Sequence, residues 1–106
     1  MSSQDSATPC FQHGRVTLSS GVIDLALQGK LDAVELFKRH LLGDWGNVRL
    51  DLGVMNELSL QNKGRLFSVY RVGPTLTLFV VTHLGRSLTV LLLPEEHESF
   101  QSDLAI

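Results

Sequence analysis

The side chains best suited to phosphate chemistry or proton transfer lie in the second half of the chain. Five of them fall in three consecutive apolar stretches: Arg65, Tyr70, Arg71, His83 and Arg86. Guanidinium groups bind phosphate through paired hydrogen bonds, and a nearby histidine or tyrosine can move a proton. If these side chains converge, they form a cationic site for a phosphate. The alternative is that the arginines pair with local carboxylates such as Glu57 and Glu95.

The four histidines do not have the spacing of a metal site. They are His13, His40, His83 and His97, and none falls in a short ligand motif such as HExxH. Cys10 is the only cysteine, so a multi-cysteine metal site and an internal disulfide are excluded. The run Ser19-Ser20-Gly21 is not a nucleophile elbow, and no glycine-rich phosphate loop occurs. We therefore expect no metal and no cofactor.

A short loop holds the only tryptophan, in the run Gly43-Asp44-Trp45-Gly46. It can be a functional loop. The alternative is that Trp45 anchors the helices to a sheet while Asp44 caps the following turn. Because this tryptophan directly follows a helix stop, we expect it to be buried against Phe37 or the strands.

The pattern of apolar residues predicts the elements that must position these groups. Three runs rich in Val, Leu, Phe and Thr end at Gly or Pro, at 65–73, 74–85 and 86–96, which is typical of short strands joined by tight turns. A further strand is expected at 15–18. Helices are expected at 21–27, 33–42 and 50–60, the second capped by Asp32 with Glu35. On the third, Leu52, Met55, Leu58 and Leu60 are expected to face inward.

Two of the predicted strands are apolar on both faces. One face is expected to hold Leu76, Leu78, Val80, Leu88, Val90 and Leu92, and the other Phe79, Val81, Leu91 and Leu93. One layer of helices cannot cover both faces. A second copy of the chain, in a homodimer, is the expected cover, and the N-terminal segment is the alternative.

Length and composition indicate one domain of 106 residues, with a flexible tail at 1–12 and an α+β domain at 13–106. The net charge of −2 argues against strong nucleic-acid binding. Residues 1–9 are too polar for a signal peptide, and Arg86 interrupts the most apolar window, so no membrane segment is expected. A soluble, cytoplasmic protein is the expectation.

An ordered set of residues between Leu36 and His97 resembles a family of small uncharacterised proteins borne on plasmids and integrative elements, the plasmid-related proteins. The likeness is carried by Asp44, Trp45, Asn56, Arg86, Ser87 and Glu96, together with Gly64-Arg65-Leu66, Ser68-Val69-Tyr70 and Leu92-Leu93-Pro94. The turn His83-Leu84-Gly85 departs from the acidic turn common in the family, and His97 stands where an aromatic residue is usual. The resemblance implies a genomic context and a fold, and these residues as a binding or structural motif.

The expected fold is α+β, with a mainly antiparallel sheet built from one N-terminal strand and a C-terminal three-stranded meander, and two or three helices on one face. The expected function is a non-enzymatic protein-interaction or accessory protein of a mobile genetic element. The alternative rests on element order, which resembles RelE/ParE-like toxins. It implies a small ribonuclease-type toxin that uses the arginine cluster with Tyr70 and His83.

Overall fold

The protein forms a four-stranded sheet with three α-helices in the computed structural model, which describes residues 9–97. The elements run in the order β1 (Arg15–Leu18), α1 (Ser20–Leu27), α2 (Ala33–Leu41), α3 (Leu50–Asn62), β2 (Leu66–Arg71), β3 (Thr77–Thr82) and β4 (Leu88–Leu92). Short 3₁₀ turns occupy Leu84–Arg86 and Pro94–Glu96. The α+β class and the predicted strands and helices are confirmed.

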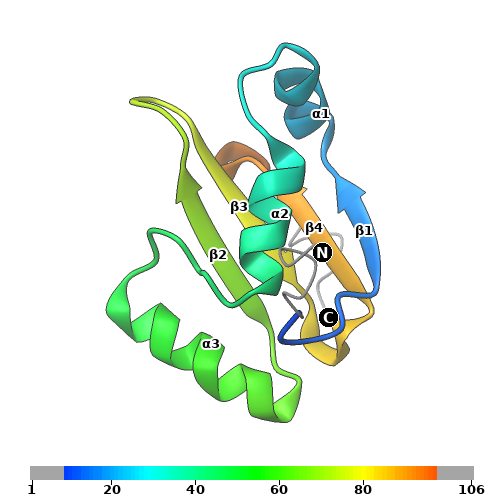
Figure 1. Cartoon of the computed structure of the whole chain (residues 1–106), viewed down its shortest axis with the longest axis vertical. Coiled ribbons are helices and arrows are strands. Elements are labelled where there is room, and N and C mark those ends of the chain that lie inside the picture. Colours follow the sequence, from blue (N-terminus) through cyan, green and yellow to red (C-terminus); the bar gives the residue numbers. More distant parts are fainter. Residues whose placement is uncertain (1–8, 98–106) are drawn as a thin grey trace, which may run out of the picture.

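The strand order is β1-β4-β3-β2, so β1 and β2 form the two edges of the sheet (Figure 1). The pairs β2–β3 and β3–β4 are antiparallel, as predicted for the meander. β1 instead pairs with β4 in parallel, which makes the sheet mixed. Antiparallel hairpins follow from tight turns, whereas three helices separate β1 from the other strands and leave its direction free.

Local capping explains where the first two helices begin. The Ser19 hydroxyl accepts a hydrogen bond from the Val22 N–H, and the Asp32 carboxylate accepts one from the Glu35 N–H at 3.0 Å. Each bond satisfies a backbone donor that has no partner inside its helix. Basic residues in the last turn of α2 lie at the negative end of its dipole. The predicted start of α2 is confirmed, and α1 begins one residue before its predicted start.

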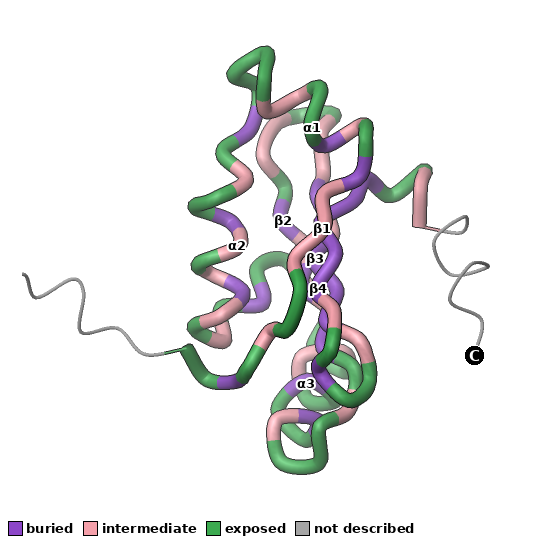
Figure 2. Tube along the Cα trace, turned by 90° about the vertical axis from the view of Figure 1, so that its right-hand side faces the viewer, coloured by how far each residue is buried: buried purple, intermediate pink, exposed green. Residues whose placement is uncertain are grey.

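Helix α2 lies over one face of the sheet (Figure 2), α1 lies at the end of the sheet beyond β1 (Figure 1), and the main core lies between these two helices and the strands. Val22 of α1 and Leu36 of α2 are buried there against Tyr70, Leu78 and Leu91 of the strands. Helix α3 lies elsewhere, beside the edge strand β2 (Figure 1). No helix within residues 9–97 is both long and apolar enough to cross a bilayer.

The two faces of the sheet combine the strands differently from the prediction. Val80 pairs with Leu91 and Val81 with Val90, so even-numbered residues of β3 share a face with odd-numbered residues of β4. Leu78 and Val80 therefore lie in one core cluster with Leu91 and Leu93, and not with Val90 and Leu92 as predicted. The length of the β3–β4 turn decides this register, and a shift of one residue exchanges the two faces.

The second face of the sheet is already enclosed at its centre within one chain. Val81, Val90 and Leu92 are buried there, with Phe67, Phe79 and Leu88 partly buried around them. The His97 ring makes edge contacts with Phe67 and Phe79, at centroid distances of 5.3 and 5.5 Å. The predicted need for a partner over this face is therefore weaker than the strand pattern alone suggests.

The segment predicted as a loose tail differs at its last residues. The Cys10 N–H donates to the Leu41 carbonyl at 2.7 Å, and the Phe11 side chain is buried. Its ring lies edge-on to His40 and stacks with Trp45. Phe11 therefore belongs to the fold, because its side chain is part of the core. The polar sequence at 1–9 led to the prediction that this residue lies in the tail. The first eight residues of the predicted tail lie outside the described residues.

Candidate functional site

The five residues predicted as a cationic site do not share one cleft. Arg65 and His83 lie at one end of the β2–β3 hairpin, and Arg71 lies at its other end. At about 3.3 Å per residue this separation along β2 is roughly 20 Å. Burial, with the nearby charge of Arg65, lowers the pKa of His83. The Tyr70 side chain is buried in the core beneath the helices and is not available to a ligand.

Arg86 is buried and serves the end of α3. Its guanidinium donates to the carbonyls of Ser59 at 2.5 Å and of Gly64 at 3.3 Å, and it lies 5.2 Å from the centre of the Phe11 ring. The Ser59 carbonyl also accepts the backbone N–H groups of Lys63 and Gly64, so Arg86 adds to the hydrogen bonds that close the last turn of α3, and Gly64 lies just past that turn. Arg86 thus stabilises the C-terminus of α3, and burial lowers its pKa.

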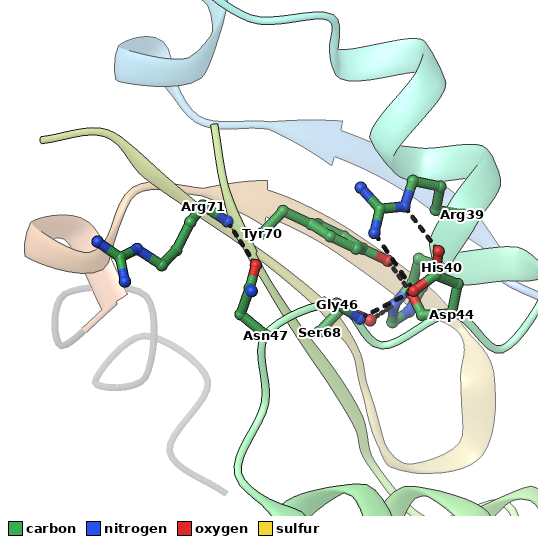
Figure 3. A network of polar contacts seen from close by, with 8 residues as sticks. All are labelled: Arg39, His40, Asp44, Gly46, Asn47, Ser68, Tyr70 and Arg71. Atoms are coloured by element: carbon green, nitrogen blue, oxygen red, sulfur yellow. Dashed lines mark hydrogen bonds and ion pairs between the residues drawn. The ribbon is translucent and has the colours of Figure 1, made fainter. Parts of the chain in front are cut away.

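Asp44 fixes the loop between α2 and α3 to the sheet (Figure 3). It accepts two bonds from Arg39, at 2.7 and 3.3 Å, and one from the Gly46 N–H. The hydrogen bond from Arg39 holds the pKa of Asp44 below its usual range. The Tyr70 hydroxyl donates to the Asp44 carbonyl at 2.5 Å, while burial raises the pKa of Tyr70 to about 12.

The same loop closes the outer edge of β2. The Val69 N–H donates to the Trp45 carbonyl at 3.0 Å, and the Asn47 N–H donates back to the Val69 carbonyl at 2.6 Å. The Asn47 side chain accepts the Arg71 N–H (Figure 3). Gly46 permits this approach, since a Cβ there would lie 2.2 Å from the Val69 carbonyl oxygen. The backbone groups at this edge, which could otherwise pair with another strand, are therefore already hydrogen-bonded.

Asn56 of α3 completes this closure. Its side-chain amide donates to the Phe67 carbonyl at 2.8 Å and accepts the Phe67 N–H at 3.0 Å. The Asn56 side chain is buried. It therefore replaces both bonds that a neighbouring strand would make with Phe67.

Trp45 is buried, as predicted, but its partners differ in part. It lies in a cluster with Leu66 of β2, and its ring contacts those of Phe11 and His40. Phe37, the helical partner suggested by the sequence, belongs to the main core cluster. The indole N–H donates to the Glu57 carboxylate at 2.8 Å, so Glu57 does not serve the arginines as the sequence suggested.

A polar chain that the sequence did not reveal runs through the core from His40. The Thr89 hydroxyl donates to the His13 carbonyl at 2.8 Å, so it accepts from Thr82 at 2.7 Å. Thr82 must then accept the His40 Nε2–H at 2.9 Å, and His40 Nδ1 accepts the Ser68 hydroxyl at 2.6 Å. The chain places a proton on His40 Nε2, and because burial lowers the pKa of His40 to about 3, the ring is neutral and Nδ1 carries no proton.

This chain is not a catalytic pair, despite the serine beside a histidine. His40 has no exposed surface and Ser68 is buried with it. Burial, with the charge of Arg86 nearby, lowers the pKa of His40 to about 3. A substrate has no access to these atoms, so the network binds α2 to the sheet.

Ser87 and Glu96, the last members of the predicted motif, also hold the fold together. Glu96 accepts the Ser19 hydroxyl at 2.5 Å, the Gly21 N–H at 3.1 Å and the Leu93 N–H at 2.8 Å. Burial raises the pKa of Glu96, but the three hydrogen bonds together lower it by more than burial raises it. The net result is a pKa below the usual range. The Ser87 carbonyl accepts the Arg15 N–H at the start of β1.

The orientation of helix α3 agrees with the prediction at Leu52 and Leu60 and differs from it at Met55 and Leu58. Its two buried residues are the polar Asn56 and Ser59, with Leu52 and Leu60 half-buried beside them. Met55 and Leu58, expected inside, are exposed. The exposed apolar side chains of α3 are Leu50 at 85%, Val54 at 50%, Met55 at 58% and Leu58 at 52%. We call these four residues the α3 surface; the four-residue spacing of Leu50, Val54 and Leu58 was the signal in the sequence.

Among the described residues no group of three or more acidic, histidine or cysteine side chains can hold a metal ion. The chain matches no protein-family model, no curated protein and no solved structure. Function must therefore be argued from the geometry itself, and the α3 surface holds four of the nine large apolar side chains that are exposed among the described residues.

Proposed function

We propose that this chain is a non-enzymatic protein-interaction protein that binds through the α3 surface. The observation that carries the proposal is the inverted polarity of α3, which buries Asn56 and Ser59 and exposes Leu50, Val54, Met55 and Leu58. Among the three described helices, α1 and α2 each bury an apolar residue against the sheet. Only α3 has polar residues at all its fully buried positions.

The polar residues on the buried side of α3 have a physical cause. A helix that lies beside a sheet edge meets backbone N–H and C=O groups, and a polar side chain such as Asn56 satisfies them. This leaves the larger apolar side chains facing outward. Burying a leucine or methionine is worth about 1.5–3 kcal/mol. A contiguous group of them on the surface is typical of a binding site for another protein.

The resemblance to plasmid-related proteins supports the wider setting of the proposal. The setting that we propose is an accessory protein of a mobile genetic element, acting in the cytoplasm. The residues that carry the likeness, such as Asp44, Trp45 and Asn56, hold the loop and α3 against β2. Their role in building this edge supports a scaffold for the α3 surface. No observation favours the ribonuclease-type toxin, whose candidate residues lie apart.

The test is affinity capture from the native host, with the tagged chain in three forms. Wild type is compared with Val54→Glu on the α3 surface and with Val34→Glu on α2. Val34 is the matched control, because it is a valine 64% exposed on another helix. We expect the captured proteins to be retained by Val34→Glu and reduced at least tenfold by Val54→Glu. Equal capture by all three forms would contradict the proposal.

A further inference from the structure

We infer that the second face of the sheet, which carries Val81, Val90 and Leu92, is covered by this chain's own segment 98–106. The segment directly follows the described residues and reads ESFQSDLAI. The inference goes beyond the proposed function, because it concerns a sheet face and not the α3 surface. It names the occupant of that face as a part of the same chain.

The first observation is the burial of side chains on this face. Val90 is 2% exposed and Leu92 is 1% exposed within a single chain. Their cluster consists of strand residues alone: Val81, Val90 and Leu92, with Phe67, Phe79 and Leu88 packed against them. Side chains on one face of a sheet stand roughly perpendicular to it, so neighbours shield their flanks and not their outer ends. Another part of the same chain must therefore lie over them.

The three α-helices do not supply this cover. Helix α2 lies over the opposite face of the sheet (Figure 2), where Leu36 is buried in the main core. Helix α3 lies beside the edge strand β2 (Figure 1). None of the three helices places a side chain in the cluster around Val90 and Leu92.

The described part of the chain ends on this same face. The His97 ring packs edge-on against Phe67 and Phe79. Glu96, one residue earlier, is held by the Ser19 hydroxyl and by the N–H groups of Gly21 and Leu93. These bonds fix the path of the chain just before His97. Segment 98–106 therefore starts over the second sheet face.

The segment has the side chains and the length for this role. Four of its nine residues are apolar: Phe100, Leu104, Ala105 and Ile106. An extended chain spans about 3.3 Å per residue, so nine residues reach at most about 30 Å. Four strands about 4.8 Å apart place the two outer strands about 14 Å from each other. The segment is therefore long enough to cross the face from β2 to β1.

Residues 1–8, which also lie outside the described range, are less suited to this face. Met1 and Ala7 are their only apolar residues. They join the described chain beside Cys10, whose N–H donates to the Leu41 carbonyl at the end of α2. That junction lies with the helix on the other side of the sheet.

The direct test is nuclear Overhauser spectroscopy of the full chain. We expect contacts from the Phe100 ring and the Leu104 methyl groups to the methyl groups of Val90 and Leu92. The methyl groups of Val80, which face α2 on the same sheet, are the internal control and should show none. A second face that contacts residues 1–8, or no part of segment 98–106, would overturn the inference. A mixture of labelled and unlabelled chains in which these contacts are intermolecular would assign the face to a second copy and also overturn it.

A stability measurement tests the same contact independently. Leu104→Ser should raise the equilibrium constant of unfolding at least about tenfold, because it removes a buried leucine side chain. Leu27→Ser is the matched control, since Leu27 is 82% exposed on α1, and it should change that constant less than about threefold. Equal effects of the two substitutions would overturn the inference. Neither substitution touches the α3 surface, so the proposed function is tested separately.

Discussion

Asn56 of α3 holds both backbone groups of Phe67 through its single side-chain amide, at 2.8 and 3.0 Å. A helix side chain thereby takes the place of a fifth strand at the edge of the sheet. The consequence reaches the opposite side of the helix, because the residues that would ordinarily be buried are turned outward. The same orientation of α3 therefore closes the edge of β2 and exposes the α3 surface.

Replacing Asn56 tests that relationship. Asn56→Ala removes the side-chain donor and acceptor that bond the backbone of Phe67. The N–H and the carbonyl of Phe67 are then left without these hydrogen-bond partners. Unsatisfied buried groups cost about 1–3 kcal/mol each, so we expect unfolding to become easier by about 2–4 kcal/mol in urea titration. Gln61→Ala, at an exposed position of the same helix, is the control and should change stability by less than about 0.5 kcal/mol. Equal effects of the two variants would show that the Phe67 contacts contribute little.

Trp45 should behave as a buried anchor. Its ring packs with Phe11 and His40 beside Leu66, so Trp45→Ala should cost about 3–5 kcal/mol of stability. The wild-type fluorescence maximum should be shifted to the blue and shift to the red on unfolding. Glu57→Gln keeps the ring in place and should lose only the charge-assisted part of one hydrogen bond, which separates packing from hydrogen bonding. Emission like that of indole in water would contradict the burial.

His40 predicts a pH dependence of stability with a definite sign. In the folded protein its pKa is lowered to about 3 by burial and by the charge of Arg86, against 6.5 in the unfolded chain. As pH falls below 6.5 the unfolded chain binds a proton that folded His40 does not accept until about pH 3. The free energy of unfolding should therefore fall by about 1.4 kcal/mol per pH unit across that window.

The measurement for His40 is the difference between wild type and His40→Gln in denaturant titrations at several pH values. Acidic groups and His83 titrate in both proteins, so their contributions cancel in the difference. Above pH 6.5 the difference should be constant. Below it the wild type should lose stability faster, and parallel curves down to pH 4 would show that His40 is not held neutral.

Arg86 should protect the end of α3. Arg86→Lys keeps the charge but cannot place a planar fork between the carbonyls of Ser59 and Gly64. We expect a loss of about 1–3 kcal/mol and faster hydrogen exchange at the last turn of α3. Arg65→Lys is the matched control because Arg65 is exposed, and it should leave exchange in α3 unchanged.

The chain should not bind nucleic acid strongly, because its net charge is −2 and its candidate cationic residues lie apart. Fluorescence anisotropy with labelled RNA and DNA at physiological salt should give no submicromolar binding. Tight binding with a steep salt dependence that is lost in Arg65→Ala would contradict this and favour the toxin interpretation.

Local sequence patterns were enough to predict the elements and several of their boundaries. Ser19 and Asp32 start helices because their side chains accept N–H groups only two or three residues away. The three C-terminal strands follow from their composition and from the Gly and Pro that separate them. Burial of Trp45 was also predictable, since a lone large aromatic after a helix stop is best placed in a core.

The packing of these elements against one another depends on contacts between residues far apart in the sequence. Helix α3 offers apolar residues on two sides, Leu52 and Leu60 on one and Leu50, Val54 and Leu58 on the other. Its orientation depends on the backbone of Phe67, which is distant in sequence and selects Asn56 for the buried side. Likewise, the β3–β4 register and the parallel direction of β1 depend on long-range pairing. Such choices are made by contacts between distant segments, which a local pattern does not record.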